Sequence, residues 1–430
     1  MLAVFTGTGL FLSARTGFFQ VTGIRRWVSG TIGTAFKRKN LHKSGDKGTI
    51  SQTQALCAAL AACLGTGNIV GVATAITSGG AGAVFWMLVS AILGTMTCCT
   101  ENMLGIIYRR RDSDGNWSGG PVMYIEQGLG KKSLAKIYAF FLVGATLGMG
   151  CMVQSNSVAA ALQSAVGVKP AVTGIILSVL TSLIISGGIR RIAAFSTRLI
   201  PILSAVFTAA SLAVIAVNYK NILPCVKQIF SGAKNMKAAR FGIARGVFSN
   251  EAGLGTSALI HSSADCETPA QQGFWGILEV TLDTVIMCTV TAFAILTSGA
   301  DTQLSGAELS SAAFASVFGK AGEVLICLSV CLFAFATLTA WAHYGQLGAV
   351  YLFGEKSKKP FLLVYAVCVF IGSVTKLDAV WSISDTLNGL MAIPNLFAVL
   401  ALSGQAVNQL GSNRLRLRIG HNFKNSNRKS

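Results

Sequence analysis

Two apolar stretches of the chain are interrupted by small and polar residues near their centres. The stretch ALCAALAACLGTGNIVGVATAI contains GTGN at residues 65–68, and the stretch FSNEAGLGTSALIHSS contains SNEAGLG at residues 249–255. We name these two segments the first break and the second break. Both stretches are apolar enough to lie in lipid, where non-helical backbone is tolerated only if it is buried in protein or lines a watery cavity. Each break is therefore a candidate binding site.

The chemistry that the first break can perform is recognition of a carboxylate. A half-helix that starts near Gly67, Asn68 and Ile69 presents N–H groups and a positive dipole end, which suit an anion. Glycine has no Cβ, so a ligand can approach this backbone closely. The carbonyl groups that both breaks free suit a bare cation such as Na⁺ or an ammonium group. For GTGN alone, a packing notch between helices is the alternative interpretation.

Three other residues within apolar stretches can complete such a site. Gln154 lies in GMGCMVQSNSVA, and Thr337 and Trp341 lie four residues apart in FAFATLTAWAHYGQ, on one face of a helix. A hydroxyl and an indole near mid-span can coordinate a cation and close off a small apolar side chain. Interhelical hydrogen bonds and interfacial aromatic contacts are the alternative roles of these residues.

Four carboxylates also lie within apolar stretches. Glu251, inside the second break, can bind a cation, hydrogen-bond the unwound backbone or couple to a proton, and the residues alone leave these roles open. We interpret Glu101, Glu279 and Asp283 as polar contacts between helices. The eleven cysteines show no metal-ligand spacing with other cysteines or histidines, so we expect neither a disulfide nor a transition-metal site.

The elements that must position these residues are membrane-spanning helices. Of 430 residues, 52% are hydrophobic and 12% are charged, about half the charged fraction of an average soluble protein. Apolar runs of about 20 residues recur along the chain, each long enough to cross a bilayer. We predict an all-α polytopic membrane protein with a short first span near residues 2–14, a basic amphipathic stretch, and ten core spans. These core spans are expected at residues 51–78, 82–108, 134–165, 171–188, 197–218, 242–263, 270–298, 321–352, 361–375 and 382–410.

The two breaks lie in core spans one and six, which four uninterrupted spans separate. An offset of five spans reverses direction across the membrane, so the two interrupted spans are antiparallel. Such a pair is typical of a secondary transporter built from two inverted halves with a site at the bilayer midplane. We expect five segments. They are an N-terminal helix with a basic cytoplasmic stretch (1–50), the first repeat (51–219), an extracellular loop (220–240), the second repeat (241–411) and a basic cytoplasmic tail (412–430).

The formal net charge of +19 is concentrated in short segments between the spans and at the C-terminus, for example RRR at 109–111 and IRR at 189–191. Basic residues between spans are typical of cytoplasmic loops, so the charge needs no nucleic-acid partner. The pattern predicts an outer N-terminus and a cytoplasmic C-terminus. The segment 220–240 does not fit this topology, because it is basic but should be outside.

Six stretches closely resemble the alanine or glycine:cation symporters of bacteria and archaea. They are GTGNIVGVATAITSGGAGAVFWM, SGGPVMYIEQGLG, GGIRRIAAFSTRLIP, ARGVFSNEAGLGTS, LDTVIMCTVTA and LMAIPNLFAVLALS. The resemblance runs in register from about residue 8 to residue 405. It implies eleven spans with the inverted-repeat, leucine-transporter-type fold of the amino acid–polyamine–organocation superfamily. It also implies import of alanine or glycine with Na⁺, occasionally H⁺, by alternating access.

Site residues follow from the same resemblance at matching positions. The implied substrate-binding residues are Thr66, Gly67, Asn68, Ile69, Gln154, Phe248, Ser249, Gly253, Thr337 and Trp341. The implied sodium-binding residues are Ala61, Gly65 and Thr337. The chain departs from the usual family sequence at Ala81, where a proline is common, and at residues 256–258, which read Thr-Ser-Ala where Ser-Ala-Pro is usual.

We therefore expect a sodium-coupled importer of alanine or glycine that acts as a monomer in a bacterial or archaeal plasma membrane. Its expected partners are the amino acid, Na⁺ and the lipid bilayer, without a cofactor. A proton-coupled carrier of another small amino acid, with Glu251 as the proton carrier, is the alternative. A membrane enzyme is disfavoured because no nucleophile–base or metal-ligand spacing appears. A channel is disfavoured because the breaks are not repeated as a ring.

Overall fold

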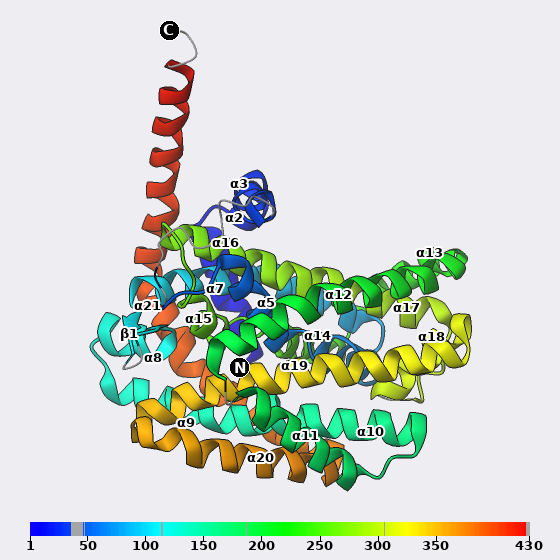
Figure 1. The fold of residues 1–430 in the computed structure, drawn as a ribbon. Helices are drawn as coiled ribbons and strands as arrows, with labels where there is room; N and C mark the ends of the chain where they lie inside the picture. Colours follow the sequence, from blue (N-terminus) through cyan, green and yellow to red (C-terminus); the bar gives the residue numbers. More distant parts are fainter. Residues whose placement is uncertain (36–45, 47, 113–114, 186, 305, 427–430) are drawn as a thin grey trace.

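The structure is a computed structural model that describes residues 1–35, 46, 48–112, 115–185, 187–304 and 306–426. Across these residues the chain is almost entirely α-helical (Figure 1), apart from a short hairpin of β1 (Arg110–Arg111) and β2 (Trp117–Ser118). In the same residues, seven helical segments are long and apolar enough to cross a membrane. The predicted all-α membrane architecture is confirmed.

The N-terminal part forms one apolar helix and three short ones. They are α1 (Leu2–Arg15), α2 (Phe19–Thr22), α3 (Ile24–Gly30) and α4 (Ile32–Ala35). Helix α1 packs against the bundle, since a Cβ added at Gly9 would lie 2.8 Å from the Leu93 carbonyl oxygen. Most of the basic run that the sequence analysis placed between residues 36 and 47 lies outside the described residues.

The first repeat predicted from the sequence contains helices whose bounds agree within a few residues with core spans one to four, whereas the helix of core span five begins nine residues before its predicted start. They are α5 (Gln52–Cys63), η2 (Thr66–Asn68), α6 (Val70–Gly79), α7 (Gly82–Ile107), α8 (Pro121–Met123), η3 (Tyr124–Gly128), α9 (Lys132–Leu147), η4 (Gly148–Val153), α10 (Gln154–Val166), α11 (Pro170–Ile185) and α12 (Gly188–Val217). Core span one is thus divided into α5 and α6. Core span three runs from α9 to α10 through the wide π-type turns of η4.

The second predicted repeat contains a further set of helices. Its elements are α14 (Met236–Asn250), α15 (Thr256–His261), α16 (Pro269–Val280), η6 (Thr281–Cys288), α17 (Thr289–Ser298), α19 (Lys320–Phe353), α20 (Lys358–Val374) and α21 (Leu377–Ser426). Besides β1, β2, α8 and η3, four further elements in the connections between core spans were not predicted from the sequence. They are η5 (Tyr219–Asn221), α13 (Ile222–Gly232), α18 (Gly306–Phe318) and η7 (Glu355–Ser357).

Backbone conformation explains where the two broken helices end. In the second break, Glu251, Gly253 and Gly255 all have positive φ angles (56°, 97° and 79°), a conformation that cannot continue a right-handed helix. In the first break, Gly65 is extended (φ −119°, ψ −144°), and α5 ends two residues before it. Both breaks predicted from the sequence are therefore present.

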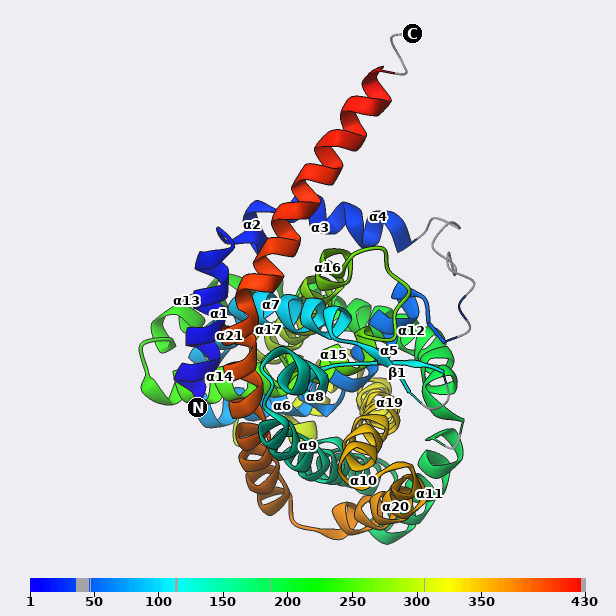
Figure 2. The same cartoon turned by 90° about the vertical axis from the view of Figure 1, so that its left-hand side faces the viewer.

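The helices form two groups that meet at the breaks. Figure 1 shows α9, α10, α11, α19 and α20 running side by side, and Figure 2 shows the same group in end-on view beside α5, α7 and α15. The C-terminal end of α21 extends away from the other helices in both views. Large apolar side chains are exposed on the peripheral helices, as contact with lipid tails requires. Examples are Ile175, Leu183, Ile202, Val206, Leu363 and Val367.

The hairpin joins the ends of three helices at one face of the molecule. Arg109 donates to the carbonyl oxygens of Ser262 (3.0 Å) and Ala264 (2.7 Å), just beyond α15. The Ile50 N–H, just before α5, donates to the Ser263 carbonyl oxygen at 3.0 Å. The Trp117 ring lies 4.5 Å from the Arg109 guanidinium. The α5 half of core span one and the α15 half of core span six therefore end at the same face.

Small residues allow α14 to pack closely on α7. A Cβ added at Gly242 would lie 2.2 Å from the Ala83 carbonyl oxygen, and one added at Gly246 would lie 2.3 Å from Ser90 Oγ. Glycine and other small residues permit this kind of backbone approach between membrane helices. The contact holds the helix that precedes the second break in place.

Gly242→Ala should therefore destabilise the protein, because the added methyl group pushes α14 away from α7. We expect a loss of about 1–3 kcal/mol, the usual cost of overpacking, measured as a lower thermal unfolding midpoint in detergent. Gly7→Ala is the matched control, since nothing lies within 4 Å of a Cβ at Gly7 on the exposed side of α1. Equal midpoints for the two variants would contradict the packing assignment.

Candidate functional site

The two breaks lie against each other in the interior of the protein. A Cβ added at Gly67 would lie 3.3 Å from the Ser249 Cα and 3.4 Å from Cδ1 of Phe248. Thr66, Asn68, Phe248 and Ser249 are all buried. The structure thus brings together residues that are about 180 positions apart in the sequence.

Gln154 reaches the first break from the opposite helix group. Its Oε1 accepts a hydrogen bond from the backbone N–H of Thr66 at 3.2 Å, and its Nε2 donates to the Met149 carbonyl oxygen at 3.2 Å. Gln154 directly follows the wide turns of η4. Asn156, two residues later, instead donates to the carbonyl oxygens of Gly372 and Thr375. Of the two amides in this stretch, Gln154 contacts the first break.

The three residues of the implied sodium site lie next to one another. Thr337 Oγ1 lies 2.9 Å from the Ala61 carbonyl oxygen. A Cβ added at Gly65 would lie 2.5 Å from the same hydroxyl oxygen. Carbonyl and hydroxyl oxygens are the ligands that hard cations prefer. Glycine is required at position 65 because a larger side chain would separate the first break from Thr337.

Glu251 connects the second break to α15 and to α19. Its Oε1 accepts from Trp341 Nε1 at 2.8 Å, and its Oε2 accepts from Thr256 Oγ1 at 2.6 Å. The Trp341 side chain is fully buried and packs on η4, where a Cβ at Gly150 would lie 2.3 Å from the Trp341 Cβ. Both carboxylate oxygens of Glu251 thus hold neighbouring side chains in place.

Gly253 faces away from the first break. Its carbonyl oxygen accepts from Asn395 Nδ2 at 2.8 Å, and a Cβ at this position would lie 2.7 Å from the Phe5 ring. Asn395 also donates to Glu101 at 2.6 Å. The neighbours of Gly253 are therefore α1 and α21, and Glu101 supports the second break through Asn395.

Ile69 and Glu279 contact elements on opposite sides of the breaks. The Ile69 carbonyl oxygen accepts from Ser310 Oγ of α18 at 3.2 Å. Glu279 accepts from Ser257 Oγ at 2.6 Å and lies 3.1 Å from His261 Nε2, both on α15. The sulfur of Cys63, the last residue of α5, lies 3.3 Å from the other Glu279 oxygen. Glu279 thus joins the α5 and α15 half-helices, in agreement with the predicted role of a contact between helices.

Three site neighbours were not identified from the sequence. Trp381 of α21 lies on Phe248, with ring centroids 4.5 Å apart. The Arg245 guanidinium lies 4.4 Å from the Trp381 ring and forms an ion pair with Asp385. Together these side chains cover Phe248. In the sequence, Arg245 and Asp385 stand out as charged residues within apolar stretches. Their spacing alone does not show that they form an ion pair.

Several buried polar atoms around the breaks have no hydrogen-bond partner among the described residues. They are Thr66 Oγ1, Asn68 Oδ1, Trp381 Nε1, Ser384 Oγ and Asn388 Oδ1. Buried polar atoms in proteins are nearly always hydrogen-bonded, and those that are not need an explanation. A polar ligand bound between the breaks and α21 would provide these partners.

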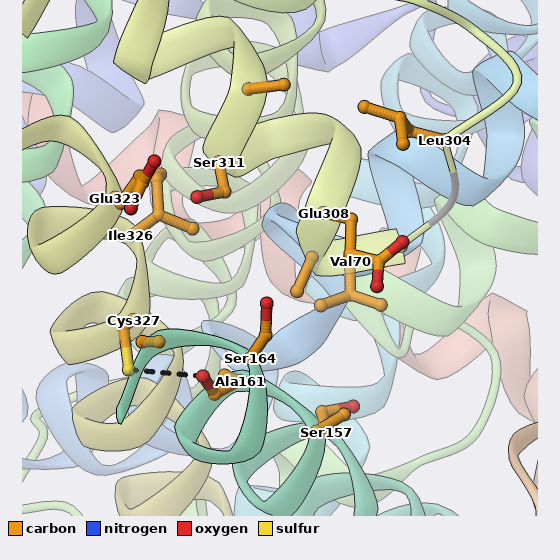
Figure 3. Close-up of a pocket in the computed structure, with 15 residues that line it drawn as sticks. Val70, Ser157, Ala161, Ser164, Leu304, Glu308, Ser311, Glu323, Ile326 and Cys327 are labelled. Atoms are coloured by element: carbon orange, nitrogen blue, oxygen red, sulfur yellow. Dashed lines mark hydrogen bonds between the residues drawn. The ribbon is translucent and has the colours of Figure 1, made fainter. Parts of the chain in front are cut away.

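Two cavities approach the breaks from different sides. One, of about 580 Å³, is lined by Val70 at the start of α6 and by residues of α10, α18 and α19. Figure 3 shows Ser164 of α10 below this cavity and Glu308 and Ser311 of α18 above it. The other, of about 330 Å³, is lined by the hairpin and by residues of α15 and α19. Thr66, Asn68 and Ser249 are at most 1% exposed, so both cavities end before the site.

Comparison with known proteins agrees with this arrangement. The sodium:alanine symporter family matches residues 1–425. An uncharacterized transporter of Haemophilus influenzae is 38% identical, over 98% of this chain and 94% of the relative. The sodium/alanine symporter AgcS of Methanococcus maripaludis is also 38% identical, over 95% of this chain and 93% of the relative.

Among solved structures, MhsT in complex with L-phenylalanine is similar in fold. The TM-score is 0.64 at 14% identity, and the match covers 83% of this chain and 90% of MhsT. At that identity the likeness concerns the fold alone. It confirms the predicted leucine-transporter-type architecture.

The contacts of Glu251 predict different effects for two substitutions. Glu251→Gln keeps polar atoms that can pair with Trp341 and Thr256, so we expect folding and transport to persist. Glu251→Leu leaves both donors buried without an acceptor, at a cost of about 1–3 kcal/mol each. Thermal unfolding midpoints and amino-acid uptake measure the difference. If the Gln variant loses uptake as completely as the Leu variant while it folds normally, transport needs the carboxylate of Glu251 itself, as a proton carrier or as a cation ligand, and the purely structural role is contradicted.

Proposed function

The chain belongs to the sodium:alanine symporter family, and on that basis we propose that it imports alanine or glycine together with Na⁺ by alternating access. The observation that carries the proposal is the contact between the two breaks, with Gly67 against Ser249 and Gln154 on Thr66. This contact brings the start of α6, the backbone of both breaks and polar side chains to one buried point.

The substrate is proposed to lie between the breaks. Its carboxylate meets the backbone N–H groups near Gly67 and Asn68, where the N-terminal end of α6 is positive. Its ammonium group meets carbonyl oxygens between Phe248 and Glu251. The buried Trp341 side chain, which donates a hydrogen bond to Glu251, is proposed to form one wall of a small pocket. Amino acids with large side chains would not fit this pocket. Gly253 contributes indirectly, since its own contacts are with α1 and α21.

Na⁺ is proposed to bind between Ala61, Gly65 and Thr337. Their close approach supports this assignment, with 2.9 Å between Thr337 Oγ1 and the Ala61 carbonyl oxygen. A cation there orders the end of α5 and the first break, which improves the site for the amino acid. By thermodynamic linkage, the amino acid must improve Na⁺ binding by the same factor.

Alternating access is proposed to use the two cavities in turn. The larger cavity lies on the α6 side of the breaks and the smaller one on the α15 side. If the basic segment at 109–111 is cytoplasmic, the larger cavity faces outward and the Arg245–Asp385 ion pair lies on the outer side. The helix group that carries the breaks then rocks against the other group, in a bacterial or archaeal plasma membrane.

Uptake into proteoliposomes tests the proposed function. With an inward Na⁺ gradient we expect accumulation of alanine or glycine, with leucine excluded. Replacement of Na⁺ by choline should reduce uptake at least about fivefold, the lower end of typical coupling between ligands. Unchanged accumulation without Na⁺, at constant pH and membrane potential, would contradict sodium coupling.

A further inference from the structure

Two arginines and a row of apolar side chains share one exposed face of α12. Arg191 and Arg198 are seven residues apart in this helix, about two turns, so they lie on the same side of it. Both side chains are exposed. They line a groove of about 490 Å³, which we name the α12 groove. Its lining residues are Arg191, Ala194, Phe195, Arg198, Leu199 and Ile202.

The apolar end of the α12 groove is open to lipid. Helix α12 lies at the edge of the helix bundle, beside α5 (Figure 2). Only 28% of its most apolar 18-residue stretch is buried, against 67% for α19. Ile202 is 67% exposed, and Val206, one turn further, is exposed as well. Apolar side chains that a spanning helix exposes contact the acyl chains of the bilayer, so this end of the groove can hold one.

The basic end of the α12 groove lies at the membrane surface. The predicted start of core span five is next to Arg198, and Arg191 precedes it by about 10 Å along the helix axis. The headgroup layer of a bilayer is roughly 5–8 Å thick on each side. Gly188 and Ile189 line the same cavity as the hairpin. This end of α12 therefore lies at the face of the basic segment 109–111, which is expected to be cytoplasmic.

The positive charge in the groove has no negative partner within the protein. Neither Arg191 nor Arg198 forms an ion pair with an acidic side chain of the described residues, and the first turn of α12 contains no acidic residue. Arg191 donates to the Leu183 carbonyl oxygen at 3.1 Å, which uses one of its five N–H donors. Arg191 also lies near the positive end of the helix dipole, where an anion is favoured. The groove thus offers charge and donors to an external anion.

Contacts on the other side of α12 connect the groove to both helix groups. The Phe195 ring packs edge-on against the Phe335 ring of α19, with centroids 5.8 Å apart. Helix α12 also packs against α5, which ends at the first break. A ligand that spans Arg191 and Arg198 would therefore hold a helix that contacts α5 in one group and α19 in the other.

We propose that the α12 groove binds an anionic phospholipid from the leaflet at the hairpin face. Its phosphate meets the guanidinium groups of Arg191 and Arg198, and one acyl chain follows Leu199 and Ile202 into the bilayer. The planar guanidinium group matches phosphate oxygens, and basic pockets at the cytoplasmic ends of spanning helices attract anionic headgroups. A free phosphate ion shares the headgroup chemistry but would leave the apolar end of the groove uncovered. The bound lipid stabilises the packing of α12.

Thermal unfolding of the full chain in detergent tests this site, with phosphatidylglycerol or phosphatidylcholine added at increasing concentration. Phosphatidylglycerol should raise the midpoint by at least about 2 °C, and phosphatidylcholine should not. Arg191→Gln and Arg198→Gln should each weaken the apparent affinity for phosphatidylglycerol about fivefold, the effect of one basic residue at a charged membrane surface. Arg190→Gln is the matched control, because it removes the same charge from an exposed neighbour that does not line the groove. It should keep the affinity of the unsubstituted protein.

Arg198→Gln is the decisive variant, because Arg191 also holds the Leu183 carbonyl oxygen and its loss can destabilise the protein without lipid. An equal loss of affinity in Arg190→Gln and Arg198→Gln would overturn the site, since the lipid would then respond only to net charge. Absence of stabilisation by phosphatidylglycerol, or equal stabilisation by phosphatidylcholine or by inorganic phosphate, would also overturn it. The measurement involves no transport, so its failure leaves the proposed function intact, and sodium-independent uptake would leave the lipid site intact.

Discussion

Every backbone polar group at membrane depth needs a partner, and two broken helices create groups that their own helices cannot satisfy. In this protein, side chains from neighbouring helices supply part of what is missing. Gln154 accepts from the Thr66 N–H, and Asn395 donates to the Gly253 carbonyl oxygen. In the second break, Glu251 accepts hydrogen bonds from Thr256 of α15 and from Trp341 of α19. The surrounding fold depends on these contacts, because the breaks are stable only where such partners surround them.

Because the two broken helices are antiparallel, the point where the breaks meet can be approached from two opposite sides of the protein. In each interrupted span the C-terminal half begins at the break, so α6 and α15 point to opposite sides. The cavity beside α6 and the cavity beside α15 therefore approach one buried point from two directions. A tilt of the broken helices against α9, α10 and α19 would extend one cavity to the site and close the other. This arrangement supports the proposed alternating access.

Much of the fold could be predicted because lipid restricts what a sequence can contain. Polar residues and glycines inside apolar runs are costly there, so the two breaks and the positions of Gln154, Thr337 and Trp341 stand out. The sequence could not show which neighbour each polar residue meets. Asp283 was interpreted as a contact between helices, but its partners Asn68 and Ser249 could not be identified. Gly253 was placed with the substrate, although its neighbours belong to α1 and α21. Spacing defines a helix face, but the identity of the neighbouring helix depends on packing between distant segments.

The central claim is that the amino acid and Na⁺ bind cooperatively at the point where the two breaks meet. Calorimetric titration of the purified protein measures this most directly, with alanine titrated in Na⁺ and in choline, and Na⁺ titrated with and without alanine. The account predicts that Na⁺ tightens alanine binding at least about fivefold and that alanine tightens Na⁺ binding reciprocally. Equal alanine dissociation constants in Na⁺ and in choline would contradict it.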